Sequence, residues 1–401
     1  MSPAWPLAAY PNGIVSYLEN LRPALAKLGV NSGVVAGLVA RDFKSKDVVD
    51  VNQHFHRSVW ERLSDRLRGD AQGVGTIRAG RAIARSVLAL DRDRRIDLIE
   101  TEEGFGLAEH IPEFIDRPMV VRLHGPWFLN GPAMGAVQDA AFERRDRDEG
   151  AAIARADAIT APSQNVLDQT REHFGLPLIG AEVIPNPGPV VPDQRRWTRS
   201  GSTSNLVLFV GRFDRHKGGD LALDSFAKVA RVQSSAQMIF AGPEDEGLLD
   251  DEGRRWSVSE YIAEKIPEES IRSRIRYLGR QTAAEIDQLR RQAAVTIVTS
   301  RYENFPMTIL EAVAYGSPLV AAAVGGIPEI VAHGENGLLA EGGNAEAIAQ
   351  GVLELFEAPE RAEALGWFAA KDAADRFSPD SVAKQTAHFY ERVPGLDVEK
   401  G

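Results

Sequence analysis

The chain of 401 residues contains no cysteine, which excludes disulfide bonds, thiolate metal sites and cysteine nucleophiles. It also lacks any run of about 18 consecutive apolar residues, so the sequence predicts no membrane-spanning helix. The first ten residues have neither a basic stretch nor a long apolar stretch, and they do not resemble a signal peptide. These absences predict a cytoplasmic protein.

Positive charge is scarcer than negative charge. The chain carries 46 lysines and arginines against 57 aspartates and glutamates, a formal net charge of −11. This balance argues against non-specific binding to nucleic acid, and we predict no nucleic-acid partner. Peripheral contact with the inner face of a membrane stays open because a group of arginines could face anionic lipid, although acidic residues interrupt it. The group consists of Arg62, Arg66, Arg78, Arg81 and Arg85.

Metal-binding patterns are weak as well. Asp91-Arg-Asp93 and Asp146-Arg-Asp148 match an Asp-x-Asp spacing. Both lie in charged stretches with helical character, where acidic side chains usually face solvent. We therefore predict no metal site, no metal requirement and no cofactor.

Short apolar runs alternate with helical stretches along the whole chain. Runs of this kind are typical of buried parallel strands, and their alternation with helices predicts an α/β fold with sheets covered on both faces. The predicted strands are Val34–Val39, Ile96–Ile99, Met119–Leu123, Ala158–Thr160, Leu206–Val210, Met238–Phe240, Ile275–Leu278, Val295–Thr299 and Leu319–Ala322.

The length of the chain predicts two domains, because 401 residues exceed the usual size of one hydrophobic core. Three prolines followed by a polar stretch mark the best linker. We predict an N-terminal domain over residues 1–190 with a short or missing first strand, a linker over 191–204, a second domain over 205–377 and a C-terminal helix over 378–401. Two such halves bind ligands between them, near the carboxyl ends of their strands.

The strongest candidate for chemistry is the segment 301–311. Glu303 and Glu311 lie eight residues apart, across a loop that follows a predicted strand and opens a helix. Residues 304–308 would present backbone N–H groups at the helix start, which suit a diphosphate. The alternative is that both glutamates merely stabilise the first turn of the helix. Further along, Gly325-Gly326 ends another predicted strand, where a backbone can approach a ligand closely.

Two cations follow the first predicted strand of the second half. Arg212 and Lys217 are five residues apart, after Gly211 and near a helix start. An arginine can bind two phosphate oxygens at once, and a lysine adds a point charge. The pattern favours a phosphate clamp, and the alternative is a solvated loop.

The first half offers weaker candidates. Gly13-Ile14 opens a predicted helix that ends at Gly29, and a helix start of small residues can face a phosphate. His124 ends a predicted strand, where a cleft residue is expected, although a single histidine is often structural. The acidic loop 100–106 could line an acceptor pocket or form a solvated turn.

Taken in order, these segments resemble glycosyltransferase family 4, the retaining group 1 enzymes with the GT-B fold. The segment from Gly211-Arg212 to Lys217-Gly218 is similar to the family's donor-phosphate clamp. Glu303 and Glu311 match its Glu-x(7)-Glu signature, and Gly325-Gly326 follows where the family places it. The resemblance extends from about residue 11 to residue 393. It departs at the N-terminus, where little chain precedes residues 11–13, so that a truncated start or a very short first strand is expected.

The resemblance implies a fold and a set of roles. The fold would be α/β of the GT-B type, with two Rossmann-like, doubly wound domains facing each other across a cleft and the C-terminal helix crossing back. Glu303 and His124 would contact the transferred sugar, and Glu311 would bind the ribose hydroxyls. The residues implied for binding the rest of the donor are Arg212, Lys217, Phe305, Pro306, Met307, Thr308, Gly13, Ile14, Gly279 and Arg280.

The implied activity is transfer of a hexosyl group, with retention, from a nucleotide-diphosphate sugar to a hydroxyl of a sugar, glycolipid or other acceptor. Such chemistry serves the synthesis of polysaccharides, glycolipids or cell-envelope glycans. Two alternatives stay open. One is another GT-B reaction on a nucleotide sugar, such as 2-epimerisation. The other is a nucleotide-sugar-binding protein whose catalysis is impaired.

Overall fold

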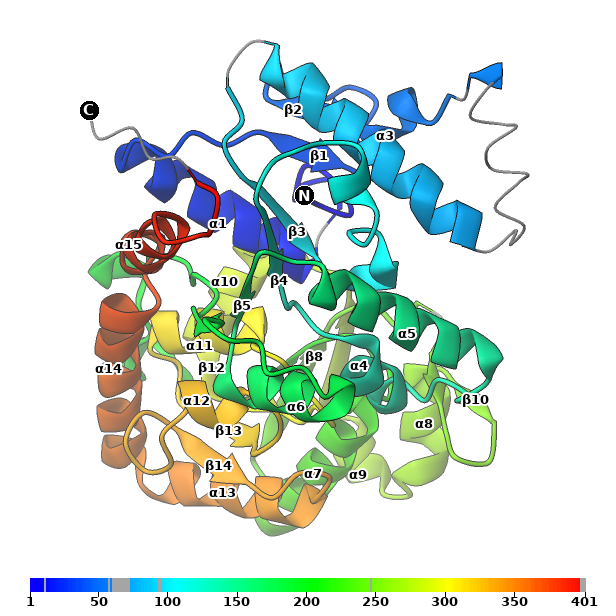
Figure 1. Cartoon of the computed structure of the whole chain (residues 1–401). Coiled ribbons are helices and arrows are strands. Elements are labelled where there is room, and N and C mark those ends of the chain that lie inside the picture. Colours follow the sequence, from blue (N-terminus) through cyan, green and yellow to red (C-terminus); the bar gives the residue numbers. More distant parts are fainter. Residues whose placement is uncertain (11, 57, 60–72, 93–94, 246, 397–401) are drawn as a thin grey trace. The chain divides into compact units, whose positions relative to one another are not determined.

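The computed structural model describes residues 1–10, 12–56, 58–59, 73–92, 95–245 and 247–396. Two compact units make up the chain (Figure 1). Unit 1 consists of Met1–Leu129, Val137–Pro187 and Pro379–Gly401, and unit 2 consists of Asn130–Ala136 and Gly188–Ser378.

Unit 1 contains four parallel strands in the order β3-β4-β5-β6 and a separate parallel pair, β1-β2. All four residues of β4 are buried, as expected for a strand covered on both faces. The strands are β1 (Val34–Ala36), β2 (Val48–Asp50), β3 (Ile99–Glu102), β4 (Met119–Arg122), β5 (Ala158–Ala161) and β6 (Glu182–Val183). The α-helices are α1 (Gly13–Lys27), α3 (Gly73–Asp91), α5 (Ala140–Ala154), α6 (Gln164–Phe174) and α15 (Pro379–Tyr390), and 3-10 turns span Val51–His54, Gly104–Gly106 and Ile111–Glu113. Helix α4 (Trp127–Ala133) begins in unit 1, and its residues from Asn130 onward belong to unit 2.

The N-terminal segment of unit 1 forms two isolated parallel bridges rather than a regular strand. Ser2 pairs with Ala36 and Trp5 pairs with Val39. The amino group of Met1 donates to the carbonyl oxygen of Glu100. Pro3 and Pro6 interrupt the segment, and proline has no N–H to donate to a ladder of hydrogen bonds.

The C-terminal helix α15 packs on α1 within unit 1 (Figure 1). The two helices share a buried cluster that includes Leu21 and Phe389. The hydroxyl of Tyr390, the last residue of α15, donates to Glu100 at 2.8 Å. The last helix of the chain is therefore part of the core of the unit that contains the first residues.

Unit 2 is built on six parallel strands in the order β11-β8-β7-β12-β13-β14. The strands are β7 (Thr203–Val210), β8 (Gln237–Ala241), β11 (Ile275–Gly279), β12 (Ala293–Val298), β13 (Leu319–Ala322) and β14 (Leu338–Ala340), with a small antiparallel pair of β9 (Leu248–Leu249) and β10 (Arg255–Trp256). The helices are α7 (Gly219–Val232), α8 (Val258–Lys265), α9 (Glu269–Arg272), α10 (Ala283–Gln292), α11 (Met307–Tyr315), α12 (Ile327–Ile330), α13 (Ala345–Glu357) and α14 (Pro359–Arg376), and 3-10 turns span Asp193–Arg195 and Arg199–Gly201. The predicted α/β class with parallel sheets is confirmed.

Residues 191–204, expected as a linker, are packed onto unit 2. Val191 is buried beside α11. The indole nitrogen of Trp197 donates to the carbonyl oxygen of Ala293 at 2.7 Å. Pro192 and the polar residues of this segment indicate an irregular backbone, but the side chains of Val191 and Trp197 hold that backbone against the unit.

One predicted strand is placed wrongly and several short ones were missed. The run Ile96–Ile99 was expected as a strand, but β3 begins only at Ile99. The N–H of Ile96 donates to the Asp91 carboxylate, and its carbonyl oxygen accepts from Arg117. The side chains of Asp91 and Arg117 therefore bond to the backbone N–H and carbonyl groups of Ile96, which a strand would use to pair with its neighbour. β2, β6 and β14 have two or three residues each, too few for a recognisable apolar pattern.

Among the helices that the structure describes, none combines the length and the apolar composition needed to cross a bilayer. Two of the arginines considered for lipid contact, Arg62 and Arg66, lie outside the described residues. Peripheral membrane contact therefore stays a prediction.

Candidate functional site

The strand order of unit 2 creates a switch point between its two central strands. β7 is the first strand of this sheet along the chain and β12 is the fourth, yet they are neighbours. Loops that leave the carboxyl ends of two such strands diverge to opposite faces of the sheet, and ligands bind in the crevice that results. The loops after β7 and β12 carry Lys217 and Glu303.

Lys217 and Glu303 form an ion pair at this switch point, with Nζ 2.6 Å from Oε1. Ser300 donates a second hydrogen bond to the same oxygen at 2.7 Å. The side chain of Glu303 is only 7% exposed and that of Lys217 is 22% exposed. Burial alone would raise the pKa of Glu303, but the charges of Lys217 and His216, with hydrogen bonds from Lys217 and Ser300, outweigh it and lower the pKa. Glu303 is therefore ionised at neutral pH.

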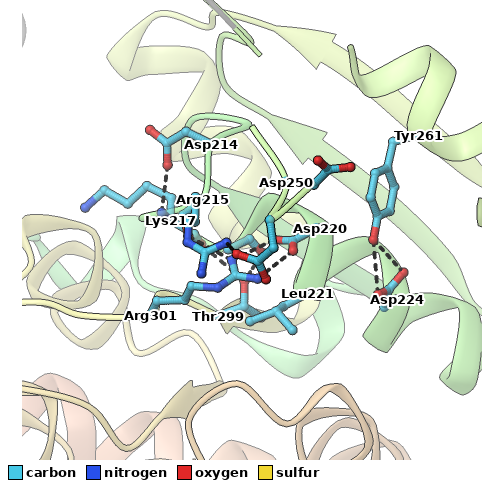
Figure 2. A network of polar contacts seen from close by, with 12 residues as sticks. Asp214, Arg215, Lys217, Asp220, Leu221, Asp224, Asp250, Tyr261, Thr299 and Arg301 are labelled. Atoms are coloured by element: carbon cyan, nitrogen blue, oxygen red, sulfur yellow. Dashed lines mark hydrogen bonds and ion pairs between the residues drawn. The ribbon is translucent and has the colours of Figure 1, made fainter. Parts of the chain in front are cut away.

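Arg301 joins the two loops. Its guanidinium donates to both carboxylate oxygens of Asp220, at 2.9 and 2.6 Å, and to the carbonyl oxygen of Arg215 at 2.8 Å (Figure 2). Its backbone N–H donates to the carbonyl oxygen of His216 at 2.9 Å. Because Asp220 lies in the first turn of α7, Arg301 fixes both the loop before α7 and the start of that helix. Apart from the charge of Arg301, no sequence pattern indicates this role.

Two glycines let the loops approach each other closely. Gly218 has φ +65°, and a Cβ there would lie 2.0 Å from the carbonyl oxygen of Thr299. Gly325 has φ +53°, and a Cβ there would lie 2.0 Å from the carbonyl oxygen of Glu303. The N–H of Gly326 donates to that same oxygen at 2.9 Å. The close approach at Gly325-Gly326 is thus to the backbone of Glu303, and the approach of a ligand to these glycines stays a prediction.

Arg212, the other cation of the predicted clamp, makes different contacts. Its Nε lies 2.5 Å from Asp214 Oδ2, and its side chain is 44% exposed. The second oxygen of Asp214 accepts the backbone N–H of Lys217 at 2.7 Å. Asp214 therefore links the two cations, of which Lys217 lies against a buried carboxylate and Arg212 lies at the surface.

Helix α11 starts directly after Pro306, which is its N-cap and gives the helix no side-chain hydrogen bond. The first-turn N–H groups of Met307 and Thr308 thus receive no side-chain cap, and with the helix dipole they form a positive end that suits a phosphate. Phe305 is buried and packs edge to face on Phe377, which anchors the loop before the helix.

Glu311 lies one turn beyond Met307 on the same face of α11. Its side chain is 38% exposed, and its Oε2 accepts a hydrogen bond from Arg290 at 2.8 Å. The first turn of α11 contains no acidic residue. The alternative that Glu303 and Glu311 serve as helix-stabilising acids of the first turn is therefore wrong, since each carboxylate pairs with a cation from another segment.

The residues predicted to face the base lie at the end of β11. The carbonyl oxygen of Gly279 accepts the N–H of Gly242 at 2.9 Å. Arg280 is exposed, 3.4 Å from Asp245. In the sheet, β8 separates β11 from β7, so Gly279 ends a strand two places from the one that leads to Lys217.

In unit 1, His124 follows β4 directly, and the ring of Tyr17 packs edge-on against its imidazole at 5.1 Å between centroids. Burial and the charge of Arg122 lower the pKa of His124 well below its usual range, so the ring is neutral at pH 7. The N–H groups of His124 and Gly125 donate to the two carboxylate oxygens of Glu103, at 2.9 and 2.7 Å.

The acidic loop before the 3-10 turn Gly104–Gly106 therefore turns inward, and Glu103 is not part of a solvated turn. Its side chain is buried. Burial and the Glu149 carboxylate raise the pKa of Glu103 to about 8, although the N–H of His124 acts in the opposite direction. Glu149, also buried, accepts the N–H groups of Phe105 and Trp127 at 3.1 and 2.6 Å. Sequence reasoning missed both carboxylates as supports of the loops after β3 and β4, because the groups that they support are backbone N–H groups.

The predicted phosphate-facing start of α1 is capped by its own chain. The side chain of Asn12 accepts the N–H groups of Ile14 and Val15, each at 3.0 Å. Gly13 is the first residue of the helix. The N–H of Ile14 therefore already has a partner, which the sequence-based expectation for Gly13-Ile14 did not include.

Two family models match the chain. The model described as Glycosyltransferase Family 4 matches residues 11–187, and the model described as Glycosyl transferases group 1 matches residues 190–372. The chain belongs to the GT-B group 1 glycosyltransferases. The predicted family is thereby confirmed, and the two halves of this glycosyltransferase match different models on either side of residues 188–189.

Curated relatives agree with this family. Glycogen synthase of Mycobacterium tuberculosis is 26% identical over 330 residues, which cover 80% of this glycosyltransferase and 74% of the relative. D-inositol 3-phosphate glycosyltransferase of Corynebacterium urealyticum is 27% identical over 253 residues, 62% of this chain and 58% of that protein.

Solved structures share the fold. Sucrose-phosphate synthase from Thermosynechococcus elongatus superposes with a TM-score of 0.69 at 20% identity, covering 95% of this chain and 93% of that one. HepE of Anabaena, in complex with UDP and glucose, gives a TM-score of 0.67 at 20% identity and covers 97% and 98% of the two chains. At this identity the likeness establishes the GT-B fold of the glycosyltransferase.

Proposed function

We propose that this glycosyltransferase transfers a hexosyl group, with retention of anomeric configuration, from a nucleotide-diphosphate sugar to an acceptor hydroxyl. The observation that carries the proposal is the Lys217–Glu303 pair at the switch point of unit 2. The half-buried ammonium of Lys217 can bind a leaving phosphate, and the buried carboxylate of Glu303 can accept hydrogen bonds from the hydroxyls of a sugar. The first-turn N–H groups of α11 add a second phosphate-binding element.

The proposed chemistry breaks the bond between the anomeric carbon and the diphosphate and joins that carbon to the acceptor oxygen, and the proton of the acceptor hydroxyl passes to the departing phosphate. Negative charge then grows on the leaving oxygen, and Lys217 and the start of α11 stabilise it, an effect of about 3–4 kcal/mol per well-placed donor in comparable sites. Arg212 lies on the same loop and adds a second cation when it leaves Asp214. His124, Gly13 and Ile14 belong to unit 1, and their roles toward the donor stay predictions from the family resemblance.

Uridine diphosphate sugars are the first donors to test, because HepE of Anabaena was solved with UDP and with UDP-glucose. The proposed acceptors are sugars, sugar phosphates and glycolipids, in line with the names of the relatives. The synthesis of polysaccharides, glycolipids or cell-envelope glycans is the proposed setting.

A transfer assay with anomer-resolved NMR tests the proposal. The protein is incubated with UDP-, GDP- and ADP-hexoses and the acceptor panel, and the product linkage is assigned from the anomeric coupling constant. Retention predicts an α-linked product from an α-linked donor. An inverted linkage contradicts retention, an epimerised nucleotide sugar without transfer supports the epimerase alternative, and binding without turnover supports the impaired binder.

A further inference from the structure

Among the arginines of unit 2 whose ion pairs the structure describes, Arg290 has the least exposed side chain. It lies in the last turn of α10, and its side chain is 1% exposed. Its Nη2 donates to Glu311 Oε2 at 2.8 Å. Among the residues that the structure describes, its Nε and Nη1 have no hydrogen-bond partner. The guanidinium of Arg290 is therefore buried away from water, and the carboxylate of Glu311 is the partner that the structure shows for it.

This pair has an unusual asymmetry of exposure. Arg290 is buried, whereas the side chain of Glu311 is 38% exposed. A buried ion pair adds little to stability compared with apolar side chains of similar volume, because both charges lose hydration. The consequence of the contact is orientation: one carboxylate oxygen of Glu311 is fixed by Arg290, and the side chain still reaches the surface.

The face of α11 that carries Glu311 leads back to the start of that helix. Met307 and Glu311 are four residues apart, about 6 Å along the axis, on one face. A nucleoside diphosphate with its phosphates at the first-turn N–H groups would have its ribose one turn further along the same face. A carboxylate held in one orientation can accept from both hydroxyls of a ribose.

We propose that Arg290 is a positioning residue that acts through Glu311 to recognise the ribose of the donor. This inference rests on the proposed function, since it presupposes a nucleoside diphosphate at α11. Arg290 itself touches no ligand. Arg290 sets the orientation of the Glu311 carboxylate and limits its rotation. The effect of Arg290 on binding is therefore restricted to ligands that carry ribose hydroxyls.

The test compares UDP, GDP and ADP with their 2′,3′-dideoxy counterparts by titration calorimetry. In the wild type, loss of the hydroxyls should weaken binding of the preferred nucleotide about 10-fold or more. Arg290→Met should weaken binding of that nucleotide roughly 5- to 10-fold and leave the dideoxy form unchanged. Arg290→Lys should restore part of the discrimination, and kcat at saturating donor should change little. Arg231→Met is the control, because it breaks another Arg–Glu pair of the same unit, between Arg231 of α7 and Glu268 at the start of α9.

Equal weakening of both nucleotide forms in folded Arg290→Met would overturn the positioning role, as would an unchanged preference for the hydroxyls. The double variant Arg290→Met/Glu311→Gln should bind no worse than Glu311→Gln alone, and additive losses would show that Arg290 acts elsewhere. If the wild type binds a diphosphate but ignores the hydroxyls, this inference fails and the proposed function stands. If the wild type binds none of the three nucleotides, the proposed function itself fails.

Discussion

The ammonium group of Lys217 lies 2.6 Å from the carboxylate of Glu303, although 86 positions of sequence separate the two residues. Lys217 follows β7 and Glu303 follows β12, which are the adjacent strands at the switch point of the sheet in unit 2. The carbonyl oxygen of Glu303 in turn accepts the N–H of Gly326, after β13. The ends of three neighbouring strands therefore meet at Glu303, through its carboxylate and its carbonyl oxygen.

The two glutamates of α11 and its preceding loop should affect different kinetic constants. Glu303→Gln is expected to lower kcat with a modest change in donor affinity, because Glu303 lies at the switch point where the sugar is proposed to react. Glu311→Gln should weaken donor binding by about 1.5–3 kcal/mol, because a charged acceptor of ribose hydroxyls is lost. Steady-state kinetics with varied donor at saturating acceptor measures both. Intact kcat with collapsed donor affinity in Glu303→Gln would reverse the two assignments.

Activity should not depend on a divalent metal. Lys217, Arg212 and the start of α11 offer positive charge where a metal would otherwise be needed. Turnover is therefore expected to persist in excess chelator at the same rate. Complete loss of transfer in chelator, restored by Mg²⁺ or Mn²⁺, would contradict the proposed role of these cations.

Glu103 should make the stability of unit 1 fall as pH rises. Its folded pKa of about 8 lies above the ordinary value of 4.5, so the folded state holds more protons between these values and the free energy of unfolding decreases through this window. Burial also raises the pKa of Glu102 and Glu149, in the same direction. The slope contributed by one such group is at most about 1.4 kcal/mol per pH unit.

Chemical denaturation between pH 5 and pH 9 tests this dependence. Glu103→Gln should reduce the slope, so that the variant gains stability relative to the wild type as pH rises. Glu172→Gln, which changes an exposed carboxylate of α6, is the control and should leave the slope unchanged. Parallel curves for the wild type and Glu103→Gln would show that Glu103 is ionised throughout this range.

Much of the site in unit 2 was predictable, because parallel strands place their carboxyl ends at one edge of a sheet. That rule was enough to expect Lys217 and Glu303 near one ligand from their positions after two apolar runs. The roles of Gly325 and Arg301 were not predictable in this way. Gly325 packs on a carbonyl oxygen and Arg301 binds a carboxylate and two carbonyl groups, and such partners leave no pattern in the sequence.

The same limit explains the errors in unit 1. Glu103 and Glu149 are acidic residues that sequence patterns assign to the surface, yet each is buried because backbone N–H groups of neighbouring loops satisfy its oxygens. Trp197 in the expected linker is another case, since one buried indole outweighs the polar composition around it. Local composition predicts where the chain is irregular, but burial depends on contacts between distant segments.

Lys217 and Arg212 are proposed to bind the diphosphate of a nucleotide donor. Titration calorimetry of UDP, GDP and ADP against the wild type, Lys217→Ala and Arg212→Ala tests it most directly, with Arg231→Ala as a control on the same unit. The wild type is expected to bind at least one of the nucleotides. Each clamp variant should lose about 2–5 kcal/mol of binding free energy, and the control should bind as the wild type does. Unchanged affinity in both folded clamp variants would contradict the account.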